Sequence, residues 1–158
     1  MSLGFIAAEN GHVDVIKALI EAGHDFQNDK GNVLYDENKK IDKKIERKCS
    51  LAYIAAKNGH VDVIKALIEA EYDFVNDEGV VFYDKNKRVK ESSSLACIAA
   101  KNGHVNVIKA LIEAGYDFQN DKGTVHYDEN GNIKQRMILA DIAAENGHME
   151  VVKALKEV

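Results

Sequence analysis

The sequence contains no proline or tryptophan and only two cysteines. Cys49 and Cys97 have neither the pair spacing of a metal or disulfide motif nor a set of partnering histidines, so we expect no cofactor. A reduced intracellular protein, in the cytoplasm, fits this cysteine usage best. An apolar run of about 18 residues is also missing, which predicts no membrane-spanning helix. We expect no signal peptide, because no charged and then apolar leader occurs.

Positive charge is also outweighed by negative charge. Acidic residues outnumber basic ones by 26 to 21, and the net charge of -5 argues against a nucleic-acid or membrane-binding protein, because such partners need a positive field. Residues 39–48 are different, with six basic and two acidic residues. This segment either binds an acidic ligand or nucleic acid, or is a solvated hairpin with Ile41 and Ile45 beneath it. We favour the hairpin, because no aromatic ladder accompanies the charges.

What the sequence does contain is one unit repeated along its length. The segment NGHVDVIKALIEA occurs at 10–22 and again at 58–70, with one change at 102–114 and a looser copy at 146–158. The glycines of these copies recur at intervals of 48, 44 and 44 residues, which indicates a stacked repeat array. We interpret the chain as an excised piece of a longer array. The expected repeats are 1–48, 49–92, 93–136 and a truncated 137–158.

Each unit predicts two helices. The first follows a serine that can cap it, at Ser2, Ser50 or Ser94, whereas Ile138 cannot accept an N–H bond and predicts a weaker start. Asn-Gly ends this helix, because glycine adopts the left-handed conformation at little cost. In the second helix, VDVIKALIEA, apolar residues recur at three- and four-residue steps. One broad face is therefore buried, and another copy of the unit must cover it.

The second helix ends differently in the second repeat. Gly23 and Gly115 follow this helix in the first and third repeats, but Glu71 stands at the same place in the second. A side chain in left-handed backbone costs about 1 kcal/mol relative to glycine. The sequence therefore predicts the weakest helix exit at Glu71.

A strand and a turn follow each helix pair. Valine and tyrosine alternate around a central residue, and the Asp-x-Asn that follows favours a turn. Each segment therefore predicts a long β-hairpin, here called a finger, whose central residues Leu34, Phe82 and His126 lie in series on one open face. These side chains either contact a partner or pack against a neighbouring finger, and both interpretations stay open. The turns are expected near Asn38, Asn86 and Asn130.

These patterns together resemble the ankyrin repeat. The second unit reads L-A-Y-I-A-A-K-N-G-H-V-D-V-I-K-A-L-I-E-A and continues from Tyr72 to Asn76, which is similar to the family's pattern over both helices. The resemblance implies a mainly α fold, an α-solenoid of stacked helix-helix-hairpin repeats that binds other macromolecules, mostly proteins, without catalysis. Two features depart from the family. The T-P-L-H opening loses its proline and histidine, and each unit exceeds the usual length of about 33 residues, which predicts long fingers.

Two patterns suggest metal binding but are better explained by structure. Four histidines follow the recurring glycines, and packed helices would hold them about 10 Å apart, too far to share one ion. The run from Tyr127 to Asn132 lacks the twelfth-position glutamate of a calcium loop and fits a turn. No phosphate loop, nucleophile elbow or paired-carboxylate motif occurs, so we expect no enzyme. The histidines are His12, His60, His104 and His148.

The sequence thus predicts a protein-binding scaffold whose partner contacts the fingers and the concave face of the first helices. Charged residues follow the alanine pair of those helices at positions that face the groove in ankyrin arrays, although surface solubility explains them equally well. Alternatives are an acidic ligand at residues 39–48, head-to-tail self-association through Leu3 and Val158, and an engineered consensus array. The candidate partner-binding residues are Leu34, Phe82, His126, Lys39, Lys40, Lys87 and Arg88 in the fingers, and Glu9, Lys57, Lys101 and Glu145 on the helices.

Overall fold

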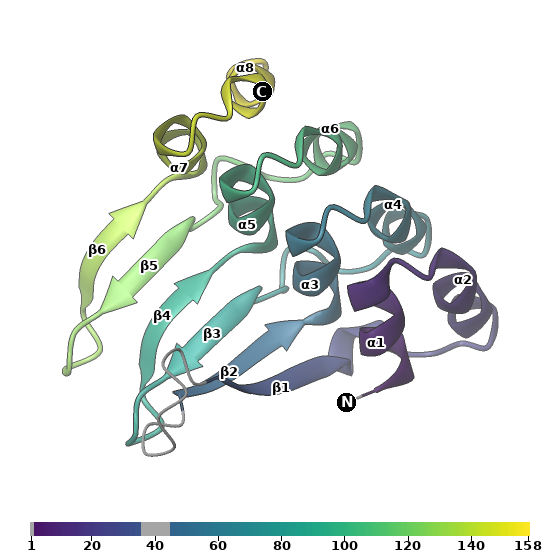
Figure 1. Cartoon of the computed structure of the whole chain (residues 1–158), viewed down its shortest axis with the longest axis horizontal. Coiled ribbons are helices and arrows are strands. Elements are labelled where there is room, and N and C mark those ends of the chain that lie inside the picture. The colour runs from purple at the N-terminus through teal and green to yellow at the C-terminus, as the bar shows by residue number, and fades with distance from the viewer. Residues whose placement is uncertain (1, 36–44) are drawn as a thin grey trace.

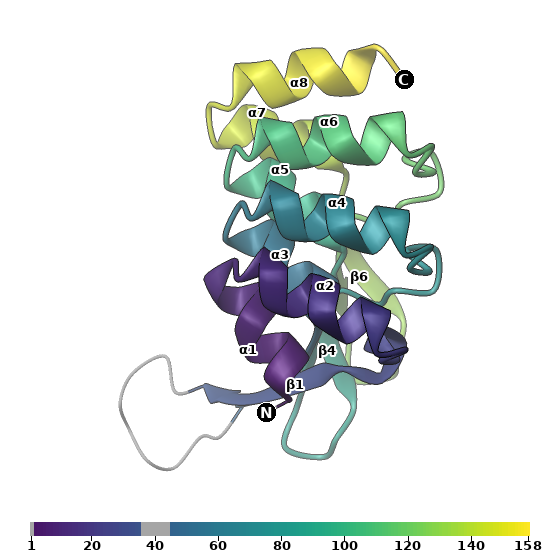
Figure 2. The ribbon, with the colours of Figure 1, turned by 90° about the vertical axis from the view of Figure 1, so that its right-hand side faces the viewer.

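The computed structural model describes residues 2–35 and 45–158, and it consists of stacked helix pairs beside a β-sheet (Figure 1). Successive pairs lie on top of one another (Figure 2), with one helix of each pair next to the sheet. The expected α-solenoid of helix-helix-hairpin repeats is confirmed. The inner helices, next to the sheet, are α1 (Leu3–Asn10), α3 (Leu51–Lys57), α5 (Leu95–Lys101) and α7 (Leu139–Glu145). The outer helices are α2 (Val13–Glu21), α4 (Val61–Glu69), α6 (Val105–Glu113) and α8 (Met149–Lys156). A 3-10 turn, η1 (Phe26–Asn28), follows α2.

Serine hydroxyls begin the first three inner helices, as predicted. Ser2, Ser50 and Ser94 each accept a hydrogen bond from the backbone N–H three residues further on, at 3.1, 3.0 and 3.0 Å. Ile138 makes no side-chain cap for α7, although its backbone has the same extended conformation. The helices are short, and within the described part of the chain none has the length and apolar character needed to cross a membrane.

Glu71 adopts the left-handed conformation that the sequence predicts. Its φ is 59°, close to the 75° of Gly23 and the 77° of Gly115. The Glu71 N–H donates to the carbonyl of Ile68 at 3.0 Å, and the Gly115 N–H donates to the carbonyl of Ile112 at the same distance. The second repeat therefore keeps the helix-end geometry of the first and third repeats, but without a glycine, which adopts this left-handed conformation at little cost.

The fingers pair with one another as well as within themselves, which was not predicted. Strand β2 pairs with β3 and β4 pairs with β5, so the fingers form one antiparallel sheet in the order β1-β2-β3-β4-β5-β6. Figure 1 shows the strands side by side along the whole stack. The strands are β1 (Lys30–Tyr35), β2 (Ile45–Ser50), β3 (Val80–Tyr83), β4 (Val89–Ser93), β5 (Thr124–Tyr127) and β6 (Ile133–Met137).

The expectation that Leu34 lies in series with Phe82 and His126 is wrong. Phe82 pairs with Glu91, which pairs with His126, so these residues occupy one row across the sheet. Leu34 is aligned through β2 with Tyr83 instead. A shift of one residue moves a position to the other face of a sheet. Leu34 therefore belongs to the row opposite to that of Phe82.

The glycine that opens each finger explains this shift. Gly79 and Gly123 are left-handed, with φ of 66° and 68°. Their carbonyls accept hydrogen bonds from the N–H groups of Ser50 and Ser94, at 2.9 and 3.2 Å, and strands β3 and β5 begin one residue later. Gly31 is not left-handed and is already part of β1. The first finger therefore pairs one residue out of step with the other two.

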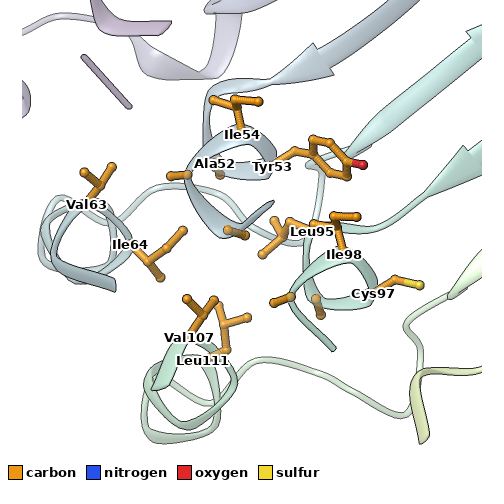
Figure 3. Packing of buried hydrophobic residues seen from close by; sticks show 14 of the residues in the cluster. Ala52, Tyr53, Ile54, Val63, Ile64, Leu95, Cys97, Ile98, Val107 and Leu111 are labelled. Carbon is orange, nitrogen blue, oxygen red and sulfur yellow. The ribbon is translucent and has the colours of Figure 1, made fainter. Parts of the chain in front are cut away.

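The core lies largely between successive helix pairs. Ala55 and Ala56 of α3 are fully buried, and their small side chains allow close approach of neighbouring backbones. Figure 3 shows Ile64 of α4 near Val107 and Leu111 of α6, and the exposed fractions of these three side chains are 0–1%. Each pair thus buries its apolar face against the next pair, so the units are stable only as a stack.

A buried carboxylate joins helix, loop and finger in the third repeat. Asp121 accepts hydrogen bonds from Ser94 Oγ at 2.8 Å and from the Gly123 N–H at 2.7 Å. It also accepts one from the Tyr116 hydroxyl, and the equivalent aspartate of the second repeat has the same three donors. Burial, followed by the charge of Asp121, raises the pKa of Tyr116, so the hydroxyl remains a donor.

Replacing Glu71 by glycine should stabilise the fold. We expect the free energy of unfolding to rise by about 1 kcal/mol, because the left-handed backbone strains a residue that has a β-carbon. Urea unfolding followed by circular dichroism measures this change. The matched control is Gly115→Glu, the reverse change at a site where a β-carbon would have no atom within 4 Å, and it should lower stability by a similar amount. Unchanged midpoints for both variants would contradict the assignment of strain.

Both cysteines should resist labelling in the folded chain. Cys49 and Cys97 each have an exposed fraction of 1%, and burial raises the pKa of both thiols. Because the thiolate is the reactive form, a disulfide reagent such as DTNB should react slowly with the native chain and rapidly after unfolding in guanidinium. Rapid native labelling would show that strand β2 opens readily at Cys49, or that the first turn of α5 opens readily at Cys97.

Candidate functional site

Three of the four repeated histidines, His60, His104 and His148, contact the preceding repeat. His60 Nε2 lies 2.9 Å from the carbonyl oxygen of Glu9, and His104 Nε2 lies 2.9 Å from that of Lys57. Each ring also covers the glycine of the preceding repeat, since a β-carbon at Gly11 would come within 2.6 Å of His60 Nδ1. This supports the structural role predicted for the histidines. In the residues that the structure describes, no group of three or more histidine, cysteine, aspartate or glutamate side chains is placed to hold a metal ion.

The charged residues predicted on the helices form one row along the stack. They lie in the last turn of the inner helices, where the side chains are half or fully exposed. Asn58 Nδ2 and Asn102 Nδ2 donate to the first two carbonyls of this row, at 2.9 and 3.1 Å, beside the histidine bonds. The backbone carbonyls of Glu9 and Lys57 are therefore each bonded by two side chains of the next repeat. Its members are Glu9, Lys57, Lys101 and Glu145, which gives the charge order negative, positive, positive, negative.

A second row crosses the sheet and faces the inner helices. Thr124 Oγ1 lies 3.1 Å from Cys97 Sγ of α5, and His126 points to the same side as Thr124 because residues two apart on a strand share a face. Figure 3 shows Cys97 and Tyr53 directed from α5 and α3 toward the strands. The row, read from the strand pairing, is Arg47, Phe82, Glu91, His126 and Gln135.

The two rows border one surface, here called the inner surface. Lys57 follows Tyr53 by one helical turn and Lys101 follows Cys97 by one turn, so each lysine lies on the helix face that looks toward the sheet. The charges of Arg47 and Glu91 both act on the hydroxyl of Tyr53, whose pKa is raised chiefly by burial. The inner surface thus consists of Arg47, Phe82, Glu91 and His126 on the sheet, and Glu9, Lys57, Lys101 and Glu145 on the helices.

Phe82 is less exposed than a residue whose only role is to contact a partner. Its side chain is half-buried and packs against the core, and the Arg47 guanidinium carbon lies 5.9 Å from the ring centroid. His126 Nδ1 lies 3.9 Å from Glu91 Oε2 on the neighbouring strand. The sheet part of the inner surface therefore offers a partly covered aromatic ring between charged groups.

The finger tips contribute mainly to structure. The turns near Asn86 and Asn130 are confirmed, and Asp84 accepts the N–H of Asn86 at 2.8 Å. Arg88 Nε lies 3.0 Å from Asp84 Oδ2, and its Nη1 donates to the Glu129 carbonyl at 2.8 Å, which ties the second finger to the third. Lys87, at φ 61°, is exposed in the same turn. Asn38, Lys39 and Lys40 lie outside the described residues.

A hollow on the opposite face of the sheet was missed. Its volume is about 480 Å³, and it lies between the second and third fingers and the loops that follow α4 and α6. Its lining comes from residues far apart in the sequence, so only stacking brings them together. The recurrence of tyrosine in the fingers is the one signal that could have indicated it. The aromatic lining residues are Phe74, Tyr83, Tyr116 and Tyr127.

Comparison with known proteins agrees with this architecture. A family model described as ankyrin repeats (3 copies) matches residues 5–122 and, in a second alignment, residues 54–158. No curated protein matches the chain significantly. The two alignments together extend from the first inner helix to the last residue, and the helix pairs and fingers described above have the order that the family requires. The chain therefore belongs to the ankyrin repeat family.

Proposed function

We propose that this chain is a non-catalytic scaffold that binds a protein partner through its inner surface. Ankyrin repeats are generally protein–protein interaction modules, and the observation that carries the proposal is the joining of the sheet row and the helix row into one surface. The free thiols of Cys49 and Cys97 favour an intracellular location, where thiols stay reduced.

Rigidity supports this role. The backbone carbonyls of Glu9 and Lys57 are each hydrogen-bonded by a histidine and an asparagine of the next repeat. The strands of the fingers are also paired across the whole sheet. A surface whose backbone is already ordered loses little conformational entropy when a partner binds. The inner surface is therefore preorganised for binding a protein segment.

Charge indicates what kind of segment fits. The middle of the helix row is positive, at Lys57 and Lys101, and its ends are negative, at Glu9 and Glu145. Complementary charges orient a partner and speed its association. A segment with acidic residues at its centre and basic residues toward its ends matches this order, with Phe82 as the apolar contact between the charges.

Reversing the central charges tests the proposal. The bait is the intact chain, used in a pull-down from lysate of its source cells in a salt series, with and without nuclease, and read by mass spectrometry. The double variant Lys57→Glu with Lys101→Glu should retain the partner at least about tenfold less well, which corresponds to roughly 1.4 kcal/mol. Truncating Phe82 is a poorer test, because its ring packs against the core and the change would also lower stability.

The matched control is Lys65→Glu with Lys109→Glu. These lysines belong to the same two repeats and are exposed, but they lie on the outer helices, so the net charge changes equally while the inner surface stays intact. The control should bind as the unaltered chain does. Equal loss in both double variants would indicate a general charge effect and remove the inner surface from the proposal. Recovery of nuclease-sensitive material alone would favour residues 39–48 as a polyanion site.

A further inference from the structure

The hollow between the second and third fingers lies beside a row of the sheet in which a basic side chain alternates with a serine. Lys48 of β2 and Ser92 of β4 both pair with Val81 of β3. Ser92 and Arg136 of β6 both pair with Val125 of β5. Lys48, Ser92 and Arg136 therefore share one face of the sheet, and each follows the last by 44 residues. Ser92 is the small member of this set, and it lines the hollow.

Lys48 shows what a basic side chain does at this position. Its Nζ lies 5.5 Å from the ring centroid of Tyr83, which belongs to the next finger, so a cation is held by the face of an aromatic ring. Tyr127 is the equivalent of Tyr83 in the third finger, and it lines the hollow together with Ser92. A serine side chain ends in a hydroxyl. Ser92 therefore provides no ammonium group for Tyr127 to bind.

Arg136 shows a second use of the same position. Its Nε donates to the carbonyl of Lys122 at 3.0 Å, and its Nη2 donates to the carbonyl of Asp121 at 3.1 Å. The equivalent residues of the second repeat are Asp77 and Glu78, which line the hollow. A carbonyl oxygen has two lone pairs, so the carbonyls of these two residues can accept hydrogen bonds from a donor outside the chain. The serine of the row is too short to bind them as the guanidinium does.

The remaining walls of the hollow also suit a long basic side chain. The volume of about 480 Å³ falls within the range of roughly 300–1,000 Å³ that is usual for ligand sites. Glu78 and Asp117 add exposed carboxylates to the lining, and Phe74 and Tyr116 add rings against which an alkyl stem can pack. The acidic lining residues are Asp77, Glu78, Asp117 and Asp121, and the basic one is Lys122.

We propose that the hollow binds an arginine side chain of a partner protein, in the place where the neighbouring fingers carry a basic side chain of their own. The guanidinium donates to the carbonyls of Asp77 and Glu78 and lies against the ring of Tyr127. Arginine fits better than lysine, because its planar group can bind two acceptors and stack on an aromatic ring at the same time. This site is on the face of the sheet opposite to the inner surface, so it does not depend on the proposed function.

Titration of the ¹⁵N-labelled full chain with a short acetylated alanine peptide that has one central arginine tests the proposal by NMR. The amide signals of Glu78, Gly79 and Tyr127 should shift and saturate at millimolar peptide. The control peptide has citrulline in place of arginine, which keeps the shape but removes the charge, and it should bind at least about tenfold less tightly. Equal binding of the two peptides, or shifts confined to residues away from the hollow, would overturn the proposal.

The variant Ser92→Arg fills the hollow from within. It should bind the arginine peptide at least about tenfold less tightly, because its own guanidinium takes the site. The midpoint of urea unfolding should not fall, since the third finger already holds Arg136 at the equivalent position. The matched control is Asn106→Arg, which adds the same charge at an exposed position of α6 outside the hollow and should bind as the unaltered chain does.

Glu78→Gln provides an independent check that does not depend on how Ser92→Arg folds. Glu78 is exposed, so the loss of its charge should leave the fold intact, and binding of the arginine peptide should weaken about threefold. Full binding by a folded Ser92→Arg variant, or an unchanged affinity of Glu78→Gln, would show that the peptide does not occupy the hollow.

Discussion

The contact between a histidine ring and the preceding repeat is the constraint from which the rest of the structure follows. The ring of His60 lies over a glycine and bonds the carbonyl at the end of α1, which fixes both the distance and the rotation between neighbouring helix pairs. A residue with a β-carbon at Gly11 would push the ring away. With the pairs in a fixed phase, the fingers leave the stack at matching heights, and their strands can pair.

Local features were predictable from sequence because local chemistry decides them. Serine caps, the Asn-Gly helix ends, the left-handed Glu71 and the turns at Asn86 and Asn130 each depend on a few adjacent residues. The ankyrin resemblance supplied the stacking. The local features and the resemblance together were enough to predict the fold class and the position of the helix row.

Features that depend on contacts between repeats were not predictable in the same way. The pairing of β2 with β3 requires the stack to exist first, and the register of β1 depends on whether its opening glycine is left-handed. Because the prediction took all three opening glycines as equivalent, it placed Leu34 in the wrong row. Phe82 likewise packs against the core and lies 5.9 Å from the guanidinium carbon of Arg47, which belongs to another strand and another repeat. A period of two along one strand carries no information about these neighbours.

The hydrogen bonds between fingers also determine how the molecule responds to a bending force. Strands β2 and β3 come from different repeats but share a hydrogen-bonded ladder, as do β4 and β5. A force that bends one finger must either shear such a ladder or carry the adjacent finger with it. The paired fingers therefore resist bending together, because no finger can move without breaking or shifting the hydrogen bonds to its neighbour.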